Sequence, residues 1–342
     1  MPKISISLAY VIAVALLGTG TLACAQELVI ATFGGSFAED TKTCHVTPFE
    51  EQTGAKAILT VGSSVQHAAK LRAMQGNPDV DVVYMDDSVA EQAKAEGLLQ
   101  KTSFEQLASF PNIAKQAFDA DGFYVNFMTA GTVIAYNPEI VKEKPDSWED
   151  LFDPQYYGRL ALGDITGTSG LHFLLAVNRM RGGDLDNLDP GFAAIKELAP
   201  HSLVFYTQAD QIVALFERGE IVIAPWYPDR AGSAADKGVP VAVAYPKEGA
   251  VGIRPTISIP KGAANAELAM KFIDIVLSAE GQNCFAERKY AGPVNTTVNL
   301  SDKVRAIVPF GEDFERMWYP DNSVVASKRA EWTERWQREI TR

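Results

Sequence analysis

Three side chains capable of ligand chemistry stand together near the end of one predicted strand. Glu220–Pro225 is a short apolar stretch rich in Val and Ile, which is typical of a buried strand. An indole at Trp226, a carboxylate at Asp229 and a guanidinium at Arg230 follow it. In an α/β sheet, ligands bind just beyond the carboxyl ends of parallel strands. A flat apolar ring beside charges of both signs would suit a small organic ion; the alternative is a core tryptophan followed by a solvated turn.

Three further strands are predicted in the first hundred residues, over Glu27–Thr32, Lys56–Val61 and Val80–Met85, with helical segments between them. Strands that alternate with helices predict a parallel, doubly wound sheet, whose strand ends face one crevice. The residues expected at these ends are Phe33, Gly34, Ser63, Ser64 and Asp86. For Asp86, the alternative is a helix N-terminal charge that complements the helix dipole.

A Gly/Ser/Thr-rich loop, Gly163–Gly170, precedes a predicted helix in the second half of the chain. Such a loop can bind an anion through its backbone N–H groups. It lacks the phosphate-loop lysine and the full dinucleotide fingerprint, so we do not interpret it as a nucleotide site. We expect Asp164 and Thr168 to face a ligand or to cap the helix. Gln208 follows the predicted strand Ser202–Tyr206 in a similar way.

Length and charge restrict the class of protein. A chain of 342 residues suggests about two domains, and 47% hydrophobic residues are enough for buried cores. The formal net charge of −12 argues against nucleic acid or an anionic membrane surface as the main partner, since both require basic patches.

The first 25 residues are typical of a secretory signal. Lys3 supplies the positive start, a mostly apolar segment follows, and Ala23-Cys24-Ala25 fits the small-residue cleavage pattern. We therefore expect cleavage before Gln26 and a periplasmic location. The alternative is a lipoprotein acylated at Cys24, which the preceding residues match poorly.

Two cysteines, Cys44 and Cys284, remain after the signal segment. In an oxidising compartment they can pair, and two buried free thiols are the alternative. The four histidines show no metal-ligand spacing, so neither a metal nor another cofactor is expected.

Several segments in a fixed order carry a family resemblance. In chain order they are TFGGSF, PFEEQTGAK, NPDVDVVYMDDS, AYNPE, LFDPQYYGRLALGD, ALFERGEIVIAPWYPDRA, ISIPKGAANAELAMKFIDIVLS and YAGPVN. Together they resemble the periplasmic substrate-binding proteins of ABC importers, specifically the polyamine-type group (extracellular solute-binding family 1). The resemblance covers about residues 26–318.

The resemblance implies a two-lobed α/β fold of the type II periplasmic-binding-protein class. Each lobe would be a doubly wound sheet with helices on both faces, and the ligand would lie in the cleft between them. Lobe 1 would comprise residues 26–133 and 255–300, and lobe 2 residues 134–254 and 301–342. This assignment puts Cys44 and Cys284 in one lobe, where a disulfide can form. A long charged helix is expected over Val325–Ile340, with Trp332 and Trp336 used for packing.

The resemblance also implies ligand-binding roles for individual residues. Phe33 matches an aromatic residue that follows the first strand in putrescine and spermidine receptors. Asp229, three residues after Trp226, matches an acid that binds a ligand ammonium. Asp86 stands where those receptors have a serine. Tyr290, at the start of the YAGPVN turn, is also expected to face the ligand.

Two departures from the polyamine pattern bear on the ligand. Gly35 stands where a second ligand-binding acid is expected, and Pro255, preceded by Arg254, stands where a third is expected. Aromatic walls and an acid bind an ammonium, whereas an arginine fork binds a carboxylate in bidentate geometry. We therefore hypothesise a small zwitterion of the ω-amino acid kind, such as γ-aminobutyrate, with Arg254 or Arg230 as the carboxylate-binding residue.

The implied mechanism is hinge closure over the ligand, followed by recognition of the closed form by an inner-membrane ABC permease. We expect a monomer and no nucleic-acid partner. The alternatives are a polyamine receptor, a ferric-iron receptor and an exported hydrolase. The tyrosine pair of iron receptors is absent, because Lys289 and Ala291 flank Tyr290. A hydrolase could use Ser63, Ser64 or Ser169, but the chain lacks a nucleophile elbow and a zinc-protease motif, so we do not expect an enzyme.

Overall fold

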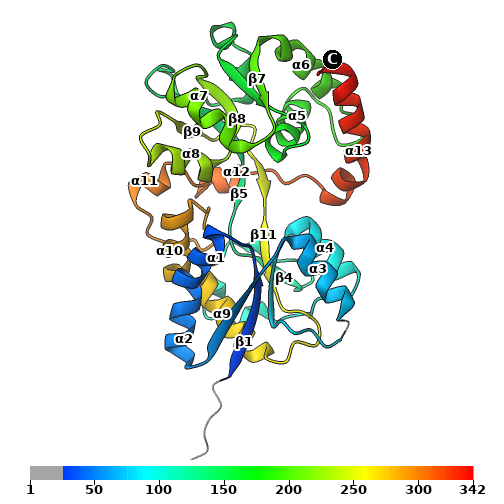
Figure 1. Ribbon diagram of the computed structural model, residues 1–342, viewed down its shortest axis with the longest axis vertical. Helices are drawn as coiled ribbons and strands as arrows, with labels where there is room; N and C mark the ends of the chain where they lie inside the picture. The colour runs from blue at the N-terminus through cyan, green and yellow to red at the C-terminus, as the bar shows by residue number, and fades with distance from the viewer. Residues whose placement is uncertain (1–25, 75, 342) are drawn as a thin grey trace, which may run out of the picture.

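Two β-sheets lie one above the other along the long axis of the molecule and divide it into two lobes (Figure 1). The structure is a computed structural model that describes residues 26–74 and 76–341. The expected signal segment, residues 1–25, and with it Cys24, lies outside the described residues. We call the part built on the first sheet lobe 1 and the part built on the second sheet lobe 2. The expected two-lobed α/β fold is thus confirmed.

Lobe 1 contains a five-stranded mixed sheet. Its strands, in spatial order, are β2 (Lys56–Val61), β1 (Glu27–Thr32), β3 (Val82–Asp86), β11 (Pro255–Ser258) and β4 (Tyr124–Asn126). β1 pairs in parallel with both β2 and β3, as predicted, whereas β11 is antiparallel to its two neighbours. The carboxyl ends of the three parallel strands point towards lobe 2 (Figure 1).

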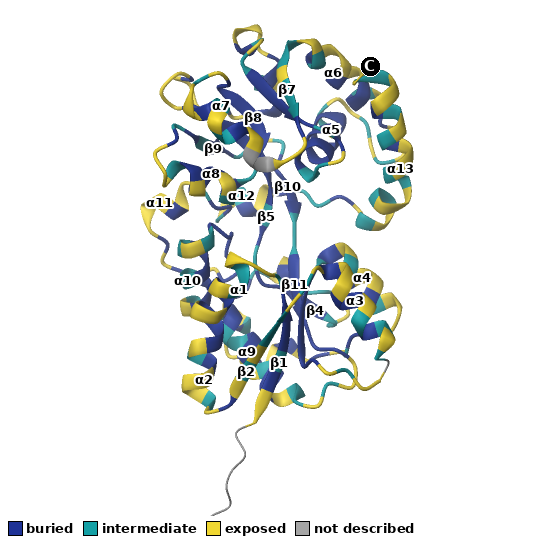
Figure 2. Ribbon diagram, viewed as in Figure 1, coloured by how far each residue is buried: buried dark blue, intermediate teal, exposed yellow. Residues whose placement is uncertain are grey.

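Helices cover both faces of this sheet (Figure 1). One face carries α3 (Ser64–Ala73) and α4 (Asp87–Ala95), and the other carries α1 (Ser36–Thr41), α2 (Thr47–Thr53), α9 (Ala266–Leu277) and α10 (Ala279–Lys289). A π-helical segment, Lys42–Val46, joins α1 to α2, and three short 3-10 helices lie over Phe104–Gln106, Phe110–Asn112 and Lys115–Ala117. Strand β3 is buried on both faces, which explains its nearly continuous apolar sequence. Figure 2 shows exposed and buried residues alternating along the covering helices α2, α3 and α4.

Lobe 2 contains the second sheet. Its strands, in spatial order, are β10 (Val251–Ile253), β5 (Ala130–Tyr136), β8 (Ile223–Trp226), β6 (Leu160–Gly163) and β7 (Ser202–Tyr206), with β9 (Ala242–Ala244) also paired to β5. Its longer helices are α5 (Thr168–Met180), α6 (Asp189–Leu198), α7 (Val213–Glu217) and α8 (Pro228–Ala235). Short 3-10 helices lie over Trp148–Phe152, Pro154–Tyr156, Ala199–His201 and Ala209–Ile212.

The chain crosses between the lobes three times, at a region that we call the waist. The first crossing joins β4 to β5 through residues 127–129, and the second joins β10 to β11 through Arg254. The third runs from Tyr290 towards α11 (Asp302–Arg305) and α12 (Glu312–Arg316). The expected lobe boundary after residue 133 falls inside β5.

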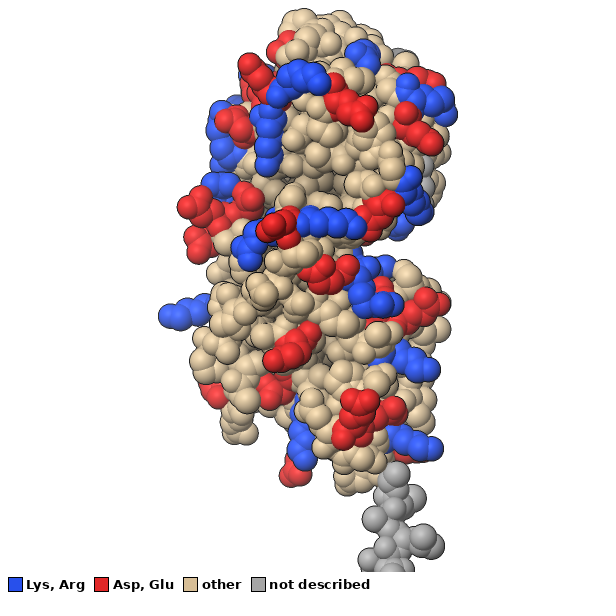
Figure 3. All heavy atoms as spheres, turned by 90° about the vertical axis from the view of Figure 1, so that its left-hand side faces the viewer, with Lys and Arg blue, Asp and Glu red and all other residues tan. Residues whose placement is uncertain are grey.

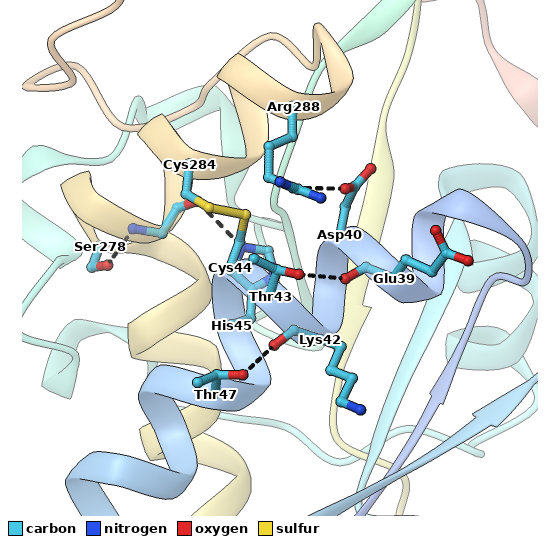
Figure 4. The surroundings of a disulfide bond; sticks show 11 residues. Glu39, Asp40, Lys42, Thr43, Cys44, His45, Thr47, Ser278, Cys284 and Arg288 are labelled. Carbon is cyan, nitrogen blue, oxygen red and sulfur yellow. Dashed lines mark hydrogen bonds and ion pairs between the residues drawn. A yellow bond between two sulfur atoms is a disulfide. The ribbon is translucent and has the colours of Figure 1, made fainter.

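The last helix, α13 (Asn322–Glu339), runs along lobe 2 and reaches back to the waist (Figure 1). Trp332 and Trp336 are buried in the lobe 2 core, in agreement with their spacing of four residues. The returning segment 255–300 is joined to lobe 1 covalently, because Cys284 of α10 forms a disulfide with Cys44 (Figure 4). An ion pair between Arg288 and Asp40, 2.8 Å long, lies beside it. Within the described residues, no helix is both long and apolar enough to span a bilayer.

Candidate functional site

The carboxyl ends of β2 and β3 meet at the waist side of lobe 1. Ser64 Oγ donates a hydrogen bond to Asp86 Oδ2 at 3.0 Å and accepts one from the Asp86 N–H at 3.0 Å. Ser64 is the first residue of α3, and Asp86 ends β3 and precedes α4. The two predicted residues therefore meet across the end of β1, which lies between β2 and β3 in the sheet.

Asp86 and Asp87 form an acidic wall on lobe 1. Burial raises the pKa of Asp86, and the hydrogen bond from Ser64 opposes that shift. Burial likewise raises the pKa of Asp87, against the charge of Arg254. Both carboxylates lie at the N-terminus of α4, where the helix dipole favours negative charge. The wall is a place where a ligand cation would be stabilised.

The loop between β6 and α5, residues 164–167, leads into the helix whose first residues line the site on lobe 2. Asp164 accepts hydrogen bonds from both the N–H and the hydroxyl of Thr166, the former at 2.9 Å, so its carboxylate closes its own turn. Thr168 begins α5, whose N-cap residue, Gly167, offers no side chain. The Ser169 N–H donates to the Tyr227 hydroxyl at 2.9 Å. No side chain of this loop caps α5; the hydroxyl of Tyr227, from the end of β8, accepts the N–H of Ser169 instead.

Residues of both lobes line one pocket of about 350 Å³ at the waist. Asp86 and Asp87 belong to lobe 1, Thr168 and His172 to lobe 2, and Arg329 to α13. A second pocket of about 680 Å³ shares Asp87 with it and extends along α4 to Tyr319 and Arg254. The smaller volume is of the size that holds a small molecule. Asp86 and Thr168 are the two predicted residues that the structure brings to one pocket.

Arg254 occupies the second crossing between the lobes. Its Nε lies 3.5 Å from Asp87 Oδ2, and its guanidinium stacks 4.3 Å from the centre of the Tyr319 ring. Gly252 makes room for that ring, because a Cβ at this position would lie 2.3 Å from Tyr319 Cε1. Arg254 therefore joins α4 of lobe 1 to the segment that precedes α13.

Asp229 and Arg230 lie side by side at the start of α8. The distance between Asp229 Oδ2 and Arg230 Nε is 3.9 Å, and their side chains are 41% and 50% exposed. Such an exposed pair is worth little to stability. Desolvation by the surrounding chain nevertheless raises the pKa of Asp229, and the charges of Arg230 and Lys289 oppose the shift.

The structure corrects the expectation for Trp226. Its side chain is 0% exposed and stacks on Phe216, with 6.0 Å between ring centres. The indole is therefore a core group, which is the alternative stated for this run of sequence. Tyr227, the next residue, is half-buried and directs its hydroxyl to the N-terminus of α5.

Tyr290 connects the two lobes on the side of α8 and α10. Its hydroxyl donates to Asp236 Oδ1 at 2.8 Å, and Lys303 pairs with the same carboxylate. The backbone of Tyr290 has a φ of 51°, which is uncommon for a residue with a side chain. A Cβ at Gly232 of α8 would lie 2.6 Å from its ring, so this glycine permits the close approach of the two lobes.

The other predicted residues stand apart from the two pockets. Phe33 is half-buried and packs edge-to-face on Phe37, with 5.0 Å between ring centres, and Gly34 beside it is exposed. Ser63 accepts a hydrogen bond from the Gln66 N–H at 3.3 Å as the N-cap of α3. Gln208 is exposed at the end of the edge strand β7.

Arg329 is the pocket residue that sequence reasoning missed. It precedes Trp332 by three residues and Trp336 by seven, so it lies on the buried side of α13. A charged residue on the apolar face of an amphipathic helix is a signal that could have found it, because such a charge requires a partner.

The other large cavities lie within one lobe, and charged side chains of both signs gather at the waist. Two cavities of about 640 and 880 Å³ are lined by lobe 1 alone, so closure of the lobes would not seal either of them. Seen from the side of α8, α10 and α11, the outline narrows at the waist, where side chains of both signs gather (Figure 3). Among the described residues, no group of three or more His, Cys, Asp or Glu side chains could hold a metal ion.

Two curated proteins share about a quarter of their sequence with this chain. The spermidine/putrescine-binding periplasmic protein of Escherichia coli is 27% identical over 296 residues, which cover 83% of this chain and 81% of that protein. The γ-aminobutyric acid-binding protein of Pseudomonas aeruginosa is 24% identical over 296 residues, covering 83% of this chain and 82% of that protein.

A solved structure and a family model agree with these similarities. The crystal structure of an ABC transporter protein from Clostridium perfringens has a TM-score of 0.79 and 26% sequence identity, covering 92% of this chain and 99% of that one. The family model for the bacterial extracellular solute-binding protein matches residues 45–308. The chain therefore belongs to the bacterial extracellular solute-binding proteins, as a polyamine-type substrate-binding protein of an ABC transporter.

Proposed function

We propose that this protein captures a small zwitterion of the ω-amino acid kind, such as γ-aminobutyrate, between its lobes. The observation that supports this most directly is the pocket at the waist, which has acids on one wall and a guanidinium on the other. A ligand amine would be stabilised by the half-buried Asp86, since charge-assisted hydrogen bonds are about twice as strong as neutral ones. An anionic group at the other end of the ligand would be stabilised by an arginine.

Closure of the lobes would enclose this ligand. Ligand binding favours the closed form only through a higher affinity for that form, which requires contacts from both lobes. Asp86 on lobe 1 and Thr168 on lobe 2 meet this requirement, because both line the same pocket. We further infer a monomer without enzymatic activity that is exported to the periplasm and delivers the ligand to an inner-membrane ABC permease.

A diamine or polyamine is the second candidate ligand class. It is favoured by the adjacent acids Asp86 and Asp87 and by the similarity to a spermidine/putrescine-binding protein. The pairing of Asp87 with Arg254 argues against it, because that carboxylate is already neutralised in part. Fewer acids then remain for a second ammonium group.

A ligand series tests the proposal. Thermal unfolding would be followed with γ-aminobutyrate, β-alanine, putrescine, spermidine, butyrate and butylamine, and each ligand that raises the melting temperature would be titrated by calorimetry. We expect γ-aminobutyrate or a close homologue to bind, and the single-charge analogues to bind at least about tenfold more weakly, since each lost charge pair costs about 1.5–3 kcal/mol. Binding of putrescine and spermidine alone would contradict the proposed ligand class and support the second one.

A further inference from the structure

Arg254, Arg230 and Arg329 differ in how their charges are balanced. Arg254 Nε lies 3.5 Å from a carboxylate oxygen of Asp87, and Arg230 Nε lies 3.9 Å from one of Asp229. Within the described chain, Arg329 makes no ion pair with a carboxylate inside the same 4.0 Å limit. Among the described residues, Arg329 is thus the arginine of the pocket whose positive charge no carboxylate balances within 4.0 Å.

Arg329 is held in place by uncharged groups. Its Nη2 donates to the carbonyl oxygens of Ile165 and Thr166, at 2.8 and 3.1 Å. Both acceptors belong to the loop between β6 and α5, which leads directly into Thr168, the first residue of α5 and a lining residue of the pocket. A guanidinium has five N–H donors in a rigid fork. Anchoring through one terminal nitrogen therefore fixes the direction of the others without neutralising the group.

The surroundings of Arg329 favour an anion. Its side chain is half-buried, and burial lowers its pKa, yet an arginine remains charged at neutral pH. A charge partly removed from water needs a partner of opposite sign. Thr168, in the same pocket, begins a 13-residue helix whose N-terminal end carries partial positive charge. Asp86 lies on the lobe 1 side of the pocket, so the two signs of charge are separated across it.

We propose that Arg329 binds the anionic end of the ligand, and that α13 thereby forms a third wall of the specificity site beside the two lobes. This inference rests on the proposed function, since it assumes a ligand with one amine and one anion. The amine then faces Asp86 and the anion faces the free edge of the Arg329 fork. Arg254, which the sequence suggested for the anion, is a positioning residue that joins α4 to the waist.

Substitution of Arg329 tests this assignment. Calorimetric titration of Arg329→Gln with γ-aminobutyrate should show affinity reduced roughly 30-fold or more, as expected when one partner of a desolvated charge pair is removed. Lys328→Gln is the matched control, because it removes the same charge from the neighbouring position. Lys328 instead contacts Asp186 at 2.6 Å and the Leu185 carbonyl at 3.0 Å, away from the pocket. Its affinity should equal that of the wild type.

A charge reversal provides a readout that a purely structural role would not give. Arg329→Glu should bind putrescine better than γ-aminobutyrate, because both have four carbons and the diamine carries a CH2–NH3+ group where γ-aminobutyrate has its carboxylate. A variant that had only lost its fold would bind neither ligand. Thermal unfolding and circular dichroism of each variant would show whether lobe 2 remains folded.

The outcomes separate this inference from the proposed function. If the wild type binds γ-aminobutyrate and Arg329→Gln binds it equally well, while Arg254→Gln weakens binding, the assignment to Arg329 is overturned and the ligand class stands. If the wild type binds diamines alone, the ligand class fails and the assignment of an anion to Arg329 fails with it. If a folded Arg329→Gln protein loses affinity and Arg329→Glu prefers the diamine, both are supported.

Discussion

The two lobes are each completed by a returning segment of chain, but they use that segment differently. In lobe 1 the segment 255–300 supplies β11, a strand inside the sheet, and is joined covalently through Cys284. In lobe 2 the C-terminal segment supplies α13, which packs against the core through Trp332 and Trp336. A lobe with an inserted strand and a disulfide cannot release its returning segment without losing its sheet. In lobe 2, α13 is not part of the sheet, so it can shift while the strands stay paired. This makes α13 suited to move when a ligand binds.

The distribution of tryptophan allows the lobes to be observed separately. All five, Trp148, Trp226, Trp318, Trp332 and Trp336, belong to lobe 2 or to the C-terminal segment. Tryptophan emission therefore follows lobe 2, while hydrogen exchange in peptides from β1 to β3 follows lobe 1.

Removal of the anchor of α13 should have the largest effect. Trp336→Ala deletes a side chain that is 1% exposed, and a Trp→Ala change in a core costs about 3–5 kcal/mol. We expect the emission-detected urea transition to move to lower urea concentration, with exchange in lobe 1 little changed. Trp336→Phe, which keeps most of the packing, is the control and should behave close to the wild type. Equal destabilisation of lobe 1 by Trp336→Ala would show that the lobes unfold as one unit and would break the comparison.

Removal of the disulfide should destabilise lobe 1 and leave lobe 2 little changed. Replacing Cys44 and Cys284 by serine frees a loop of sequence separation 240, and loss of a native disulfide typically costs about 2–5 kcal/mol. We expect faster exchange in β1–β3 and α10, with an unchanged tryptophan transition. Wild-type protein treated with a reductant is the control, since reduction should reproduce the effect while leaving the double variant unaltered. Destabilisation confined to lobe 2 would contradict the assignment of this bond to lobe 1.

Acid should weaken both lobes through their buried histidines, which are His45 and His67 in lobe 1 and His172 in lobe 2. Burial is the main cause that lowers the pKa of His45 to about 4 and that of His172 to about 3. Between these values and the unfolded pKa of about 6.5, the unfolded chain holds a proton that the folded chain does not. Stability is therefore lost as the pH falls below about 6.5, by up to about 1.4 kcal/mol per pH unit for each histidine.

Asparagine substitutions would sharpen this expectation. His172→Asn should flatten the pH dependence of the tryptophan transition and leave that of lobe 1 unchanged, while His45→Asn should do the reverse. The measurement is the urea midpoint between pH 7 and pH 4. An unaltered slope in both variants would show that carboxylates, rather than these histidines, govern the loss of stability in acid.

The parallel strands of lobe 1 could be predicted from the sequence, and so could the closeness of Ser64 and Asp86 at their carboxyl ends. Apolar strands alternating with helices require parallel pairing, and parallel pairing brings Ser64 and Asp86 within hydrogen-bond distance. The disulfide followed from the implied lobes rather than from the residues themselves, because a separation of 240 residues gives no local signal. Neither step needed side-chain geometry.

The aromatic wall could not be predicted because successive residues of a strand point to opposite sides. Trp226 and Tyr227 are adjacent, and nothing in one sequence says which of them faces the core. The structure buries the indole and leaves the phenol half-buried. Composition favours a large apolar ring in the core, but it does not determine which residues of the strand face the core and which face away from it.

The sequence could not show which arginine binds a ligand anion, because that depends on whether a nearby carboxylate already neutralises the guanidinium. Arg254 lies near an acid that is far from it in the chain, Asp87, and the position of α4 across the waist brings them together. In the part of the chain that the structure describes, Arg329 has no acidic partner within 4.0 Å, and its position depends on how α13 docks on lobe 2. Long-range docking of this kind is set by packing between elements, which periodicity within one helix does not reveal.

The position of β11 also has a consequence for biosynthesis. Its residues, Pro255–Ser258, separate β3 from β4 in space although they are made more than a hundred residues later. A nascent chain that has emerged only as far as β4 therefore has no complete first sheet to form, since the strand between its two halves has not yet been translated. The first sheet can therefore be completed only after translation has passed Ser258, when about three quarters of the chain has been made.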